Sequence, residues 1–204
     1  MSQRILQGFA GLLAVLVLGL AIFWQPEMPE RALPTVAGPA GGEFVLNSAS
    51  GPVALKDFRG KVVLVYFGYT YCPDICPTSL AATAAGLNLL TPEERASVAM
   101  IFISVDPERD TPARLKEYVE FFHPSMIGVT GTPESIAEIA RRYGVFYAKQ
   151  KVETAGDGYV VDHSADTYVV GPEGQLLGKI AHATPPDQVV TEIRHRLQQV
   201  QGKK

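Results

Sequence analysis

Cysteine is scarce in this 204-residue chain, which contains only Cys72 and Cys76, and tryptophan occurs once. Two thiols cannot build the dense disulfide framework of a small secreted domain, and they are too few for an iron–sulfur cluster held by four cysteines. The sequence also has no run of Lys or Arg that resembles a nucleic-acid-binding patch, and its formal net charge is −3. We therefore expect no surface that binds nucleic acid.

A long uncharged segment is present near the N-terminus. No charged residue lies between Arg4 and Glu27, and every residue from 8 to 24 is apolar or Gly. A helix that crosses a membrane needs about 20 mostly apolar residues. We predict a retained transmembrane anchor at residues 5–24 rather than a signal peptide, because no small-x-small cleavage motif follows the apolar segment. The positive charge before the helix predicts that residues 1–4 are cytoplasmic and that the rest faces outward, into the periplasm of a bacterium.

The remainder is predicted to be a linker followed by one domain. Residues 25–42 are rich in Pro and Gly, without helical or strand periodicity, which is typical of an extended tether. Residues 43–201 alternate between apolar runs typical of buried strands and segments with helical spacing, which predicts a layered α/β domain. The expected strands are 44–46 and 53–55 as a hairpin, then 61–67, 98–105, 167–170 and 175–180; the expected helices are 77–90, two that begin at 111 and 132, and 185–200.

The two cysteines follow the first buried strand and precede a helix, a position where sites form in open α/β sheets. Pro77 suits the first helical position, so Cys76 is the predicted N-cap. The partial positive charge of a helix N-terminus lowers a thiol pKa. We therefore expect at least one of the two thiols to ionise readily.

Three interpretations of the C-x-x-x-C pair remain open on this evidence. A permanent disulfide is sterically feasible but would add little to the stability of the fold, because it closes a very short loop. A reversible dithiol–disulfide pair is the second interpretation, and a site for a soft metal ion is the third. A metal ion needs a third ligand from the histidines, which are His123, His163, His182 and His195. His163 stands out because it falls in a predicted loop just before a strand.

Three blocks of the sequence, FGYTYCPDICPTSL, ISVDPERDTP and VDHSADTYVVGPEG, resemble the Sco/SenC family of thioredoxin-fold copper proteins. The resemblance covers about residues 43–200. It implies a thioredoxin-like α/β fold with a central mixed sheet flanked by helices. It also implies that Cys72, Cys76 and His163 bind a copper ion, Cu(I) or Cu(II), and that the two cysteines form a redox-active disulfide.

The resemblance suggests further residues around the ligands. Asp162 and Asp106 are candidates to support them, while Arg109 and Asp110 match a family block without an assignable role. Tyr71 is a departure, because many relatives have a histidine before the first cysteine.

The function implied by the resemblance is that of a membrane-anchored periplasmic metallochaperone rather than an enzyme. Such a protein would deliver copper to the copper-bearing subunit of cytochrome c oxidase and receive it from a periplasmic donor. The main alternative is a thiol–disulfide oxidoreductase that reduces the cysteines of the oxidase copper site. A peroxiredoxin-like peroxidase is disfavoured by the spacing of Thr70 and Cys72, and a chaperone remnant without metal is disfavoured by the intact set of Cys and His.

Overall fold

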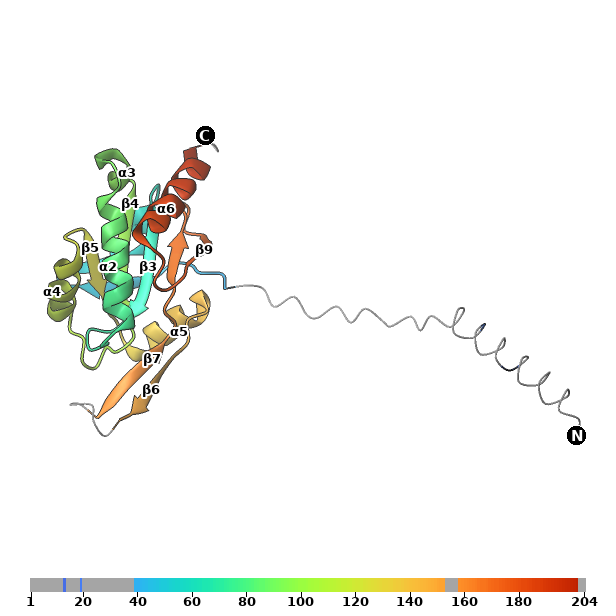
Figure 1. Ribbon diagram of the computed structural model, residues 1–204. Coiled ribbons are helices and arrows are strands. Elements are labelled where there is room, and N and C mark those ends of the chain that lie inside the picture. Colours follow the sequence, from blue (N-terminus) through green and yellow to red (C-terminus); the bar gives the residue numbers. More distant parts are fainter. Residues whose placement is uncertain (1–12, 14–18, 20–38, 153–157, 202–204) are drawn as a thin grey trace, which may run out of the picture. The chain divides into compact units, whose positions relative to one another are not determined.

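The computed structural model describes residues 13, 19, 39–152 and 158–201 (Figure 1). The predicted anchor at 5–24 lies outside the described residues, except for positions 13 and 19. The part of the predicted linker before residue 39 also lies outside them. Among the residues that are described, no helix has both the length and the apolar character needed to cross a membrane.

Strands and helices alternate along the described domain, as the sequence predicts (Figure 1). The strands are β1 Val45–Ser48, β2 Gly51–Ala54, β3 Val62–Gly68, β4 Val98–Ser104, β5 Met126–Val129, β6 Tyr147–Lys151, β7 Tyr159–His163, β8 Thr167–Val170 and β9 Leu176–Ile180. The helices are η1 Leu55–Phe58, α2 Ile75–Asn88, α3 Pro92–Ala96, α4 Pro112–Phe122, α5 Pro133–Tyr143 and α6 Pro186–Gln201.

A five-stranded sheet in the order β5-β4-β3-β8-β9 forms the centre of the domain. Strand β3 pairs in parallel with β4 and antiparallel with β8, so the sheet is mixed, as expected. All seven residues of β3 are buried, in agreement with its uninterrupted apolar sequence. The β3–β4 pairing places the carboxyl ends of both strands at one edge, where the cysteines follow β3.

Helices cover both faces of this sheet. Tyr66 and Phe67 are neighbours on β3, so their side chains point to opposite faces. The Tyr66 hydroxyl reaches the carbonyl of Ile75 at the start of α2, whereas the Phe67 ring packs against Tyr143 of α5 with centroids 5.6 Å apart. Figure 1 shows α6 beside α2, and the Gly86 position allows their close approach.

The helix ends follow the expected chemistry, with one correction. Helices α4 and α5 begin with a Thr-Pro pair whose threonine hydroxyl accepts a backbone N–H, and α5 ends at Gly144 in the left-handed conformation, as predicted. The prediction that Cys76 is an N-cap is wrong, because α2 begins at Ile75 and Asp74 precedes it. Pro77 fits inside the first turn, where a backbone N–H has no helical partner to bond.

Strand pairing corrects a second prediction. His163 is the last residue of β7, not part of a loop, and it lies opposite Tyr147 of β6. The β6–β7 hairpin was not predicted, because β6 contains the exposed polar residues Lys149, Gln150 and Lys151 and lacks an apolar run.

Residues before the predicted domain boundary at 43 also pack on the domain. Gly41 N–H donates to the carbonyl of Arg142, and the Tyr143 hydroxyl donates to the carbonyl of Gly42.

Candidate metal centre

Two segments bring three donor side chains together. Cys72 lies in the turn after β3, and Cys76 is the second residue of α2. His163 comes from the end of β7, 87 residues after Cys76. The two Sγ atoms and an imidazole nitrogen all lie within 4.8 Å of one another. The structure thus assembles the three residues that the sequence suggests as ligands.

The end of β3 is shaped to receive the Cys76 sulfur. A Cβ atom added at Gly68 would lie 2.6 Å from Cys76 Sγ and 3.0 Å from the ring of Phe102. A side chain at this position would therefore collide with the thiol and with the core. Glycine allows the sulfur to lie directly against the strand, where Cys76 is fully buried.

Hydrogen bonds fix the tautomer of His163. Its Nδ1 lies 2.9 Å from the carbonyl oxygen of Ser164, which can only accept, so Nδ1 carries the proton. In the neutral ring this leaves the lone pair on Nε2, which lies 3.2 Å from Cys76 Sγ. The nitrogen that faces the thiols is therefore the one able to bind a metal ion.

The two thiols differ in acidity. A hydrogen bond from the Cys76 thiol, with smaller help from backbone N–H groups, lowers the pKa of Cys72 to about 4 despite partial burial. Burial and the adjacent Cys72 sulfur raise the pKa of Cys76. These opposite shifts favour a thiolate at Cys72 and a thiol at Cys76, and the expectation that one thiol ionises readily stays a prediction.

Two tyrosines hold the imidazole in place. The rings of Tyr66 and Tyr69 meet the His163 ring edge to face, with centroid distances of 6.2 and 5.8 Å. The Tyr69 hydroxyl also accepts the backbone N–H of Val161 at 3.2 Å, two residues before His163 on β7. Sequence reasoning missed both residues, although YFGYTYC places them in the same segment as Cys72.

A cavity of about 520 Å³ opens beside the donors. Cys72, Ile75, Phe146, Val160, His163 and Ser164 are among the residues that line it. Its lining is largely apolar, and the Phe146 side chain at its rim is 64% exposed. A second molecule can therefore approach Cys72 and His163 from solvent, while Cys76 remains behind them.

The remaining predicted residues have defined places. Asp162 is exposed and lies opposite Ala148 of β6, while the Ser164 carbonyl contacts Nδ1 of His163. Asp106 is fully buried and accepts a hydrogen bond from the Tyr159 hydroxyl at the other end of β7.

The other three histidines make contacts elsewhere. His123 contacts Ser125, His182 contacts Ser79 and His195 contacts Gln199.

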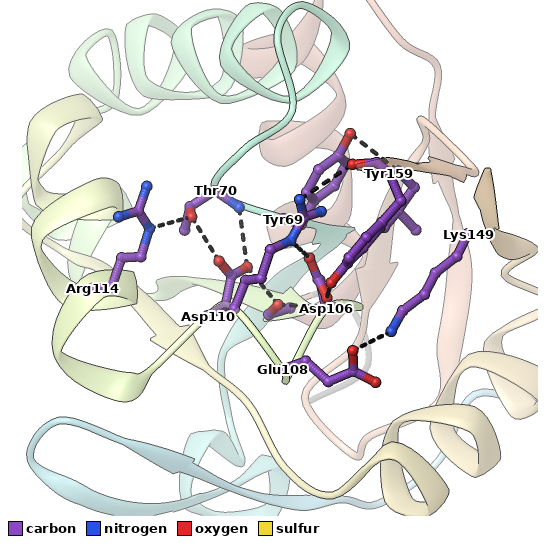
Figure 2. Close-up of polar contacts among 11 residues, drawn as sticks. Tyr69, Thr70, Asp106, Glu108, Asp110, Arg114, Lys149 and Tyr159 are labelled. Carbon is purple, nitrogen blue, oxygen red and sulfur yellow. Dashed lines mark hydrogen bonds and ion pairs between the residues drawn. The ribbon is translucent and has the colours of Figure 1, made fainter. Parts of the chain in front are cut away.

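Asp110 orders the turn that leads to Cys72. Its carboxylate accepts the Thr70 hydroxyl at 2.6 Å, the Thr70 backbone N–H at 3.0 Å and the Ser104 hydroxyl at 2.6 Å (Figure 2). Arg114 donates to the same Thr70 hydroxyl oxygen at 2.6 Å. This network ties the turn to the end of β4, a role that the sequence did not reveal.

Tyr71, the departure from the family pattern, lies between two arginines. The guanidinium carbons of Arg109 and Arg114 lie 4.8 and 4.2 Å from the centre of its ring. The ring is therefore engaged with cations beside the thiols rather than among the three donors.

The donor set permits two kinds of chemistry. Two sulfurs and one imidazole nitrogen form a compact three-donor site for a soft metal ion. The same two sulfurs can be oxidised to a disulfide, because they lie close together and one is already a thiolate. Geometry alone allows both.

Comparison with known proteins identifies the family. The SCO1/SenC family model matches residues 34–198. SCO1 homolog 1 of Arabidopsis thaliana mitochondria is 46% identical over 159 residues, which are 76% of this chain and 47% of that protein. The chain therefore spans less than half the length of this curated relative.

Solved structures agree with this match. Bradyrhizobium japonicum ScoI with copper bound has a TM-score of 0.70 and 37% identity, covering 77% of this chain and 99% of that chain. BsSco, a Sco-family cytochrome c oxidase assembly protein in which a disulfide switch was identified, has a TM-score of 0.60 and 26% identity over 79% of this chain and 95% of that chain. These likenesses confirm the thioredoxin-like fold, and together with the family model they show that the chain belongs to the SCO1/SenC family.

Proposed function

We propose that this protein binds one copper ion through Cys72 Sγ, Cys76 Sγ and His163 Nε2, and that it delivers the copper to cytochrome c oxidase during assembly of the oxidase copper site. The observation that carries the proposal is the convergence of the three donor atoms within 4.8 Å. Its support from relatives is that B. japonicum ScoI was solved with copper bound and that BsSco belongs to a family of oxidase assembly proteins.

The chemistry of the donors suits copper. Thiolates are soft ligands that favour Cu(I), and imidazole nitrogen suits copper in either oxidation state. Structural zinc sites almost always have four protein ligands, whereas the group here contains three. Cys72 is already ionised and His163 presents a lone pair at Nε2, so only the Cys76 proton must leave when the metal binds.

Transfer by ligand exchange fits the open side of the site. A thiolate or imidazole of the acceptor would enter through the cavity and form a bond to copper, while one of the bonds to Cys72 or His163 breaks. Copper keeps its oxidation state in this exchange and is never released as a free ion. The acceptor would be the copper-bearing subunit of the oxidase, and a periplasmic copper donor would load the site by the reverse exchange.

A second function is favoured by the Cys72 thiolate. A thiolate beside a protonated thiol is the arrangement used for thiol–disulfide exchange, which would reduce the cysteines of the oxidase copper site. In that reaction the oxidase disulfide gains two electrons and Cys72 and Cys76 become the disulfide. His163 distinguishes the two functions, because electron exchange between sulfurs does not require an imidazole nitrogen.

We further propose that residues 5–24 anchor the protein in the inner membrane, with the domain from residue 43 in the periplasm. The support is the uncharged apolar sequence between Arg4 and Glu27. Protease treatment of spheroplasts, which digests only the outward-facing part, tests the orientation. Protection of the domain in intact spheroplasts would refute it.

Metal analysis of the full chain, purified reduced and without oxygen, tests the proposed function. We expect about one copper ion per chain, and almost none in the Cys72→Ser/Cys76→Ser variant. His195→Ala is the matched histidine control, because His195 lies on α6 beside Gln199, and it should bind copper normally. Equal copper content in the wild type and the double cysteine variant would refute the proposal.

A further inference from the structure

Three side chains connect the strand that carries His163 to the loop after β4. We propose that Asp106, Arg109 and Tyr159 form a latch whose role is to position the His163 imidazole against the two thiols. The inference rests on the proposed copper binding and extends it to residues that do not touch the metal ion.

Main-chain pairing alone does not place His163. Within the described part of the chain, β6 and β7 pair with each other in a separate two-stranded sheet, outside the five-stranded sheet. The thiols, in contrast, follow β3 at the centre of that larger sheet. The backbone reaches the larger sheet again only at Thr167, where β8 begins, so the other end of β7 depends on side-chain contacts for its position.

The latch supplies such contacts at the far end of β7. The Tyr159 hydroxyl donates to Asp106 Oδ1 at 2.9 Å, and Arg109 Nη1 donates to the Tyr159 carbonyl at 3.2 Å. Arg109 Nε forms an ion pair with Asp106 Oδ2 at 2.5 Å, and its guanidinium carbon lies 3.7 Å from the centre of the Tyr159 ring. Figure 2 shows the Tyr159 side chain beside Asp106. Both the side chain and the backbone of Tyr159 are thus held.

The latch is anchored to the same sheet as the thiols. Asp106 lies two residues after the end of β4, is 0% exposed, and donates its backbone N–H to the Ser104 hydroxyl. Ser104 lies opposite Gly68 in the parallel β3–β4 pairing, and the Cys76 sulfur lies against Gly68. A continuous rigid path therefore runs from the thiols through β3 and β4 to the latch.

Strand β7 carries the constraint from the latch to the imidazole. Tyr159 and His163 are four residues apart on one strand, so their side chains share a face about 13 Å apart. Tyr69 holds Val161 midway between them. Burial and the hydrogen bond to Asp106 raise the pKa of Tyr159 to about 12, so its hydroxyl remains a donor at physiological pH.

The chain contains a matched control for the latch. Lys149 of β6 pairs with Glu108 at 2.6 Å, and this ion pair joins the same hairpin to the same loop (Figure 2). Its side chains are 42% and 61% exposed, so solvent screens the interaction. Lys149 Nζ also lies 4.8 Å from the centre of the Tyr159 ring, so the control changes Glu108 and keeps Lys149. Glu108→Gln weakens the attachment of the hairpin but leaves the hydrogen bonds among Asp106, Arg109 and Tyr159 in place.

The test is a double-mutant cycle on copper affinity in the full chain. Tyr159→Phe, Asp106→Asn and the control Glu108→Gln are each made in the wild type and in His163→Ala, and the Cu(I) dissociation constant is measured by competition with a chromophoric chelator. Loss of a group that orients a metal ligand typically weakens binding about 10-fold or more. We expect that loss for Tyr159→Phe and Asp106→Asn only when His163 is present, and a change below about twofold for Glu108→Gln.

The outcomes distinguish a latch that positions His163 from a general structural role of these residues. Equal weakening with and without His163 would mean a general structural defect and would overturn the latch, as would unchanged affinity in both latch variants. Tyr159→Phe removes one hydroxyl and keeps the ring on Arg109, so it decides the question if Asp106→Asn fails to fold. Failure of the unmodified chain to bind Cu(I) would instead refute the proposed function.

Discussion

The two cysteines illustrate how neighbouring residues acquire different chemistry. Sequence reasoning placed both at a helix N-terminus and expected a lowered pKa without saying for which thiol. In the structure, the Cys76 backbone N–H donates to Cys72 Sγ, and the pKa of Cys72 is lowered while burial raises the pKa of Cys76, so the charge of the pair favours Cys72. The asymmetry depends on which sulfur faces the core, and a spacing of four residues does not encode that.

This asymmetry predicts selective alkylation. In the reduced, metal-free chain at pH 6, iodoacetamide should modify Cys72, which lines the cavity, and spare Cys76, which is 0% exposed. Because the Cys72 pKa of about 4 leaves it ionised throughout, its rate should be nearly constant from pH 6 to 8. An ordinary thiol would accelerate roughly a hundredfold over that range. Peptide mass spectrometry gives both rates, and an ordinary pH profile at Cys72 would contradict the assignment.

His123 is predicted to make folding sensitive to pH. Burial lowers the pKa of His123, and its Nδ1 accepts hydrogen bonds from the backbone N–H and hydroxyl of Ser125. As the pH falls below about 6.5, the unfolded chain takes up this proton first, so stability present above that pH is lost. The loss has a limiting slope of about 1.4 kcal/mol per pH unit. In urea unfolding between pH 7 and 5, His123→Asn should show a flatter profile, whereas the surface variant His195→Asn should match the wild type.

The candidate ligands were predictable from sequence, but the residues that hold them were not. C-x-x-x-C and the V-D-H segment identify Cys72, Cys76 and His163 because short motifs carry that information. Tyr159 acts through a side chain that reaches another loop, and Ser164 acts through its backbone carbonyl. Neither contact leaves a recognisable pattern in the local sequence.

At the scale of secondary structure, long apolar runs made the central strands predictable, whereas β5, an apolar strand of only four residues, was missed. Strands β3 and β4 are buried along nearly their whole length and were predicted close to their observed bounds. The β6–β7 hairpin has a polar, exposed first strand, so tertiary contacts rather than local preference define it. Because the hairpin depends on tertiary contacts, the side chains of the latch determine its position.

The junction between β3 and α2 gives a prediction for the whole element pair. Gly68→Ala should displace the Cys76 sulfur and weaken Cu(I) binding, because the added methyl group would lie 2.6 Å from Sγ. Gly86→Ala is the control, since its Cβ would lie 2.8 Å from Val189 Cγ1 between α2 and α6, away from the site. Both variants should lose roughly 1–3 kcal/mol of the free energy of unfolding, and therefore unfold at a lower temperature. Only Gly68→Ala should lose copper affinity, and equal affinity in the two variants would contradict this account of Gly68.

At the scale of the whole molecule, the sequence predicted the layered α/β domain and its family, and the described domain confirms both. Hydrophobic periodicity is sufficient for the layers because each buried strand and each amphipathic helix must cover the other. The anchor at 5–24 stays a prediction. The beginning of the domain was less predictable, since Gly41 and Gly42 pack through backbone hydrogen bonds and a Pro/Gly-rich segment is also typical of a linker.

Copper should couple to the stability of the whole domain. A ligand that binds only the folded state adds about 2.7 kcal/mol at a free concentration 100 times its dissociation constant. We therefore expect Cu(I) to raise the melting temperature of the reduced chain. After oxidation to the Cys72–Cys76 disulfide the shift should disappear, because no thiolate remains. Calorimetry of both forms tests this, and an equal shift in the oxidised form would place copper elsewhere.

X-ray absorption spectroscopy of the Cu(I)-loaded full chain, beside His163→Ala, tests the central claim most directly. If the three converging donors bind copper together, the wild type should show two sulfur neighbours and one nitrogen neighbour, and the variant should lose the imidazole signal while keeping both sulfurs. Identical spectra, with sulfur as the sole protein donor in each, would mean that His163 does not bind copper and that the pair acts as a simple dithiol.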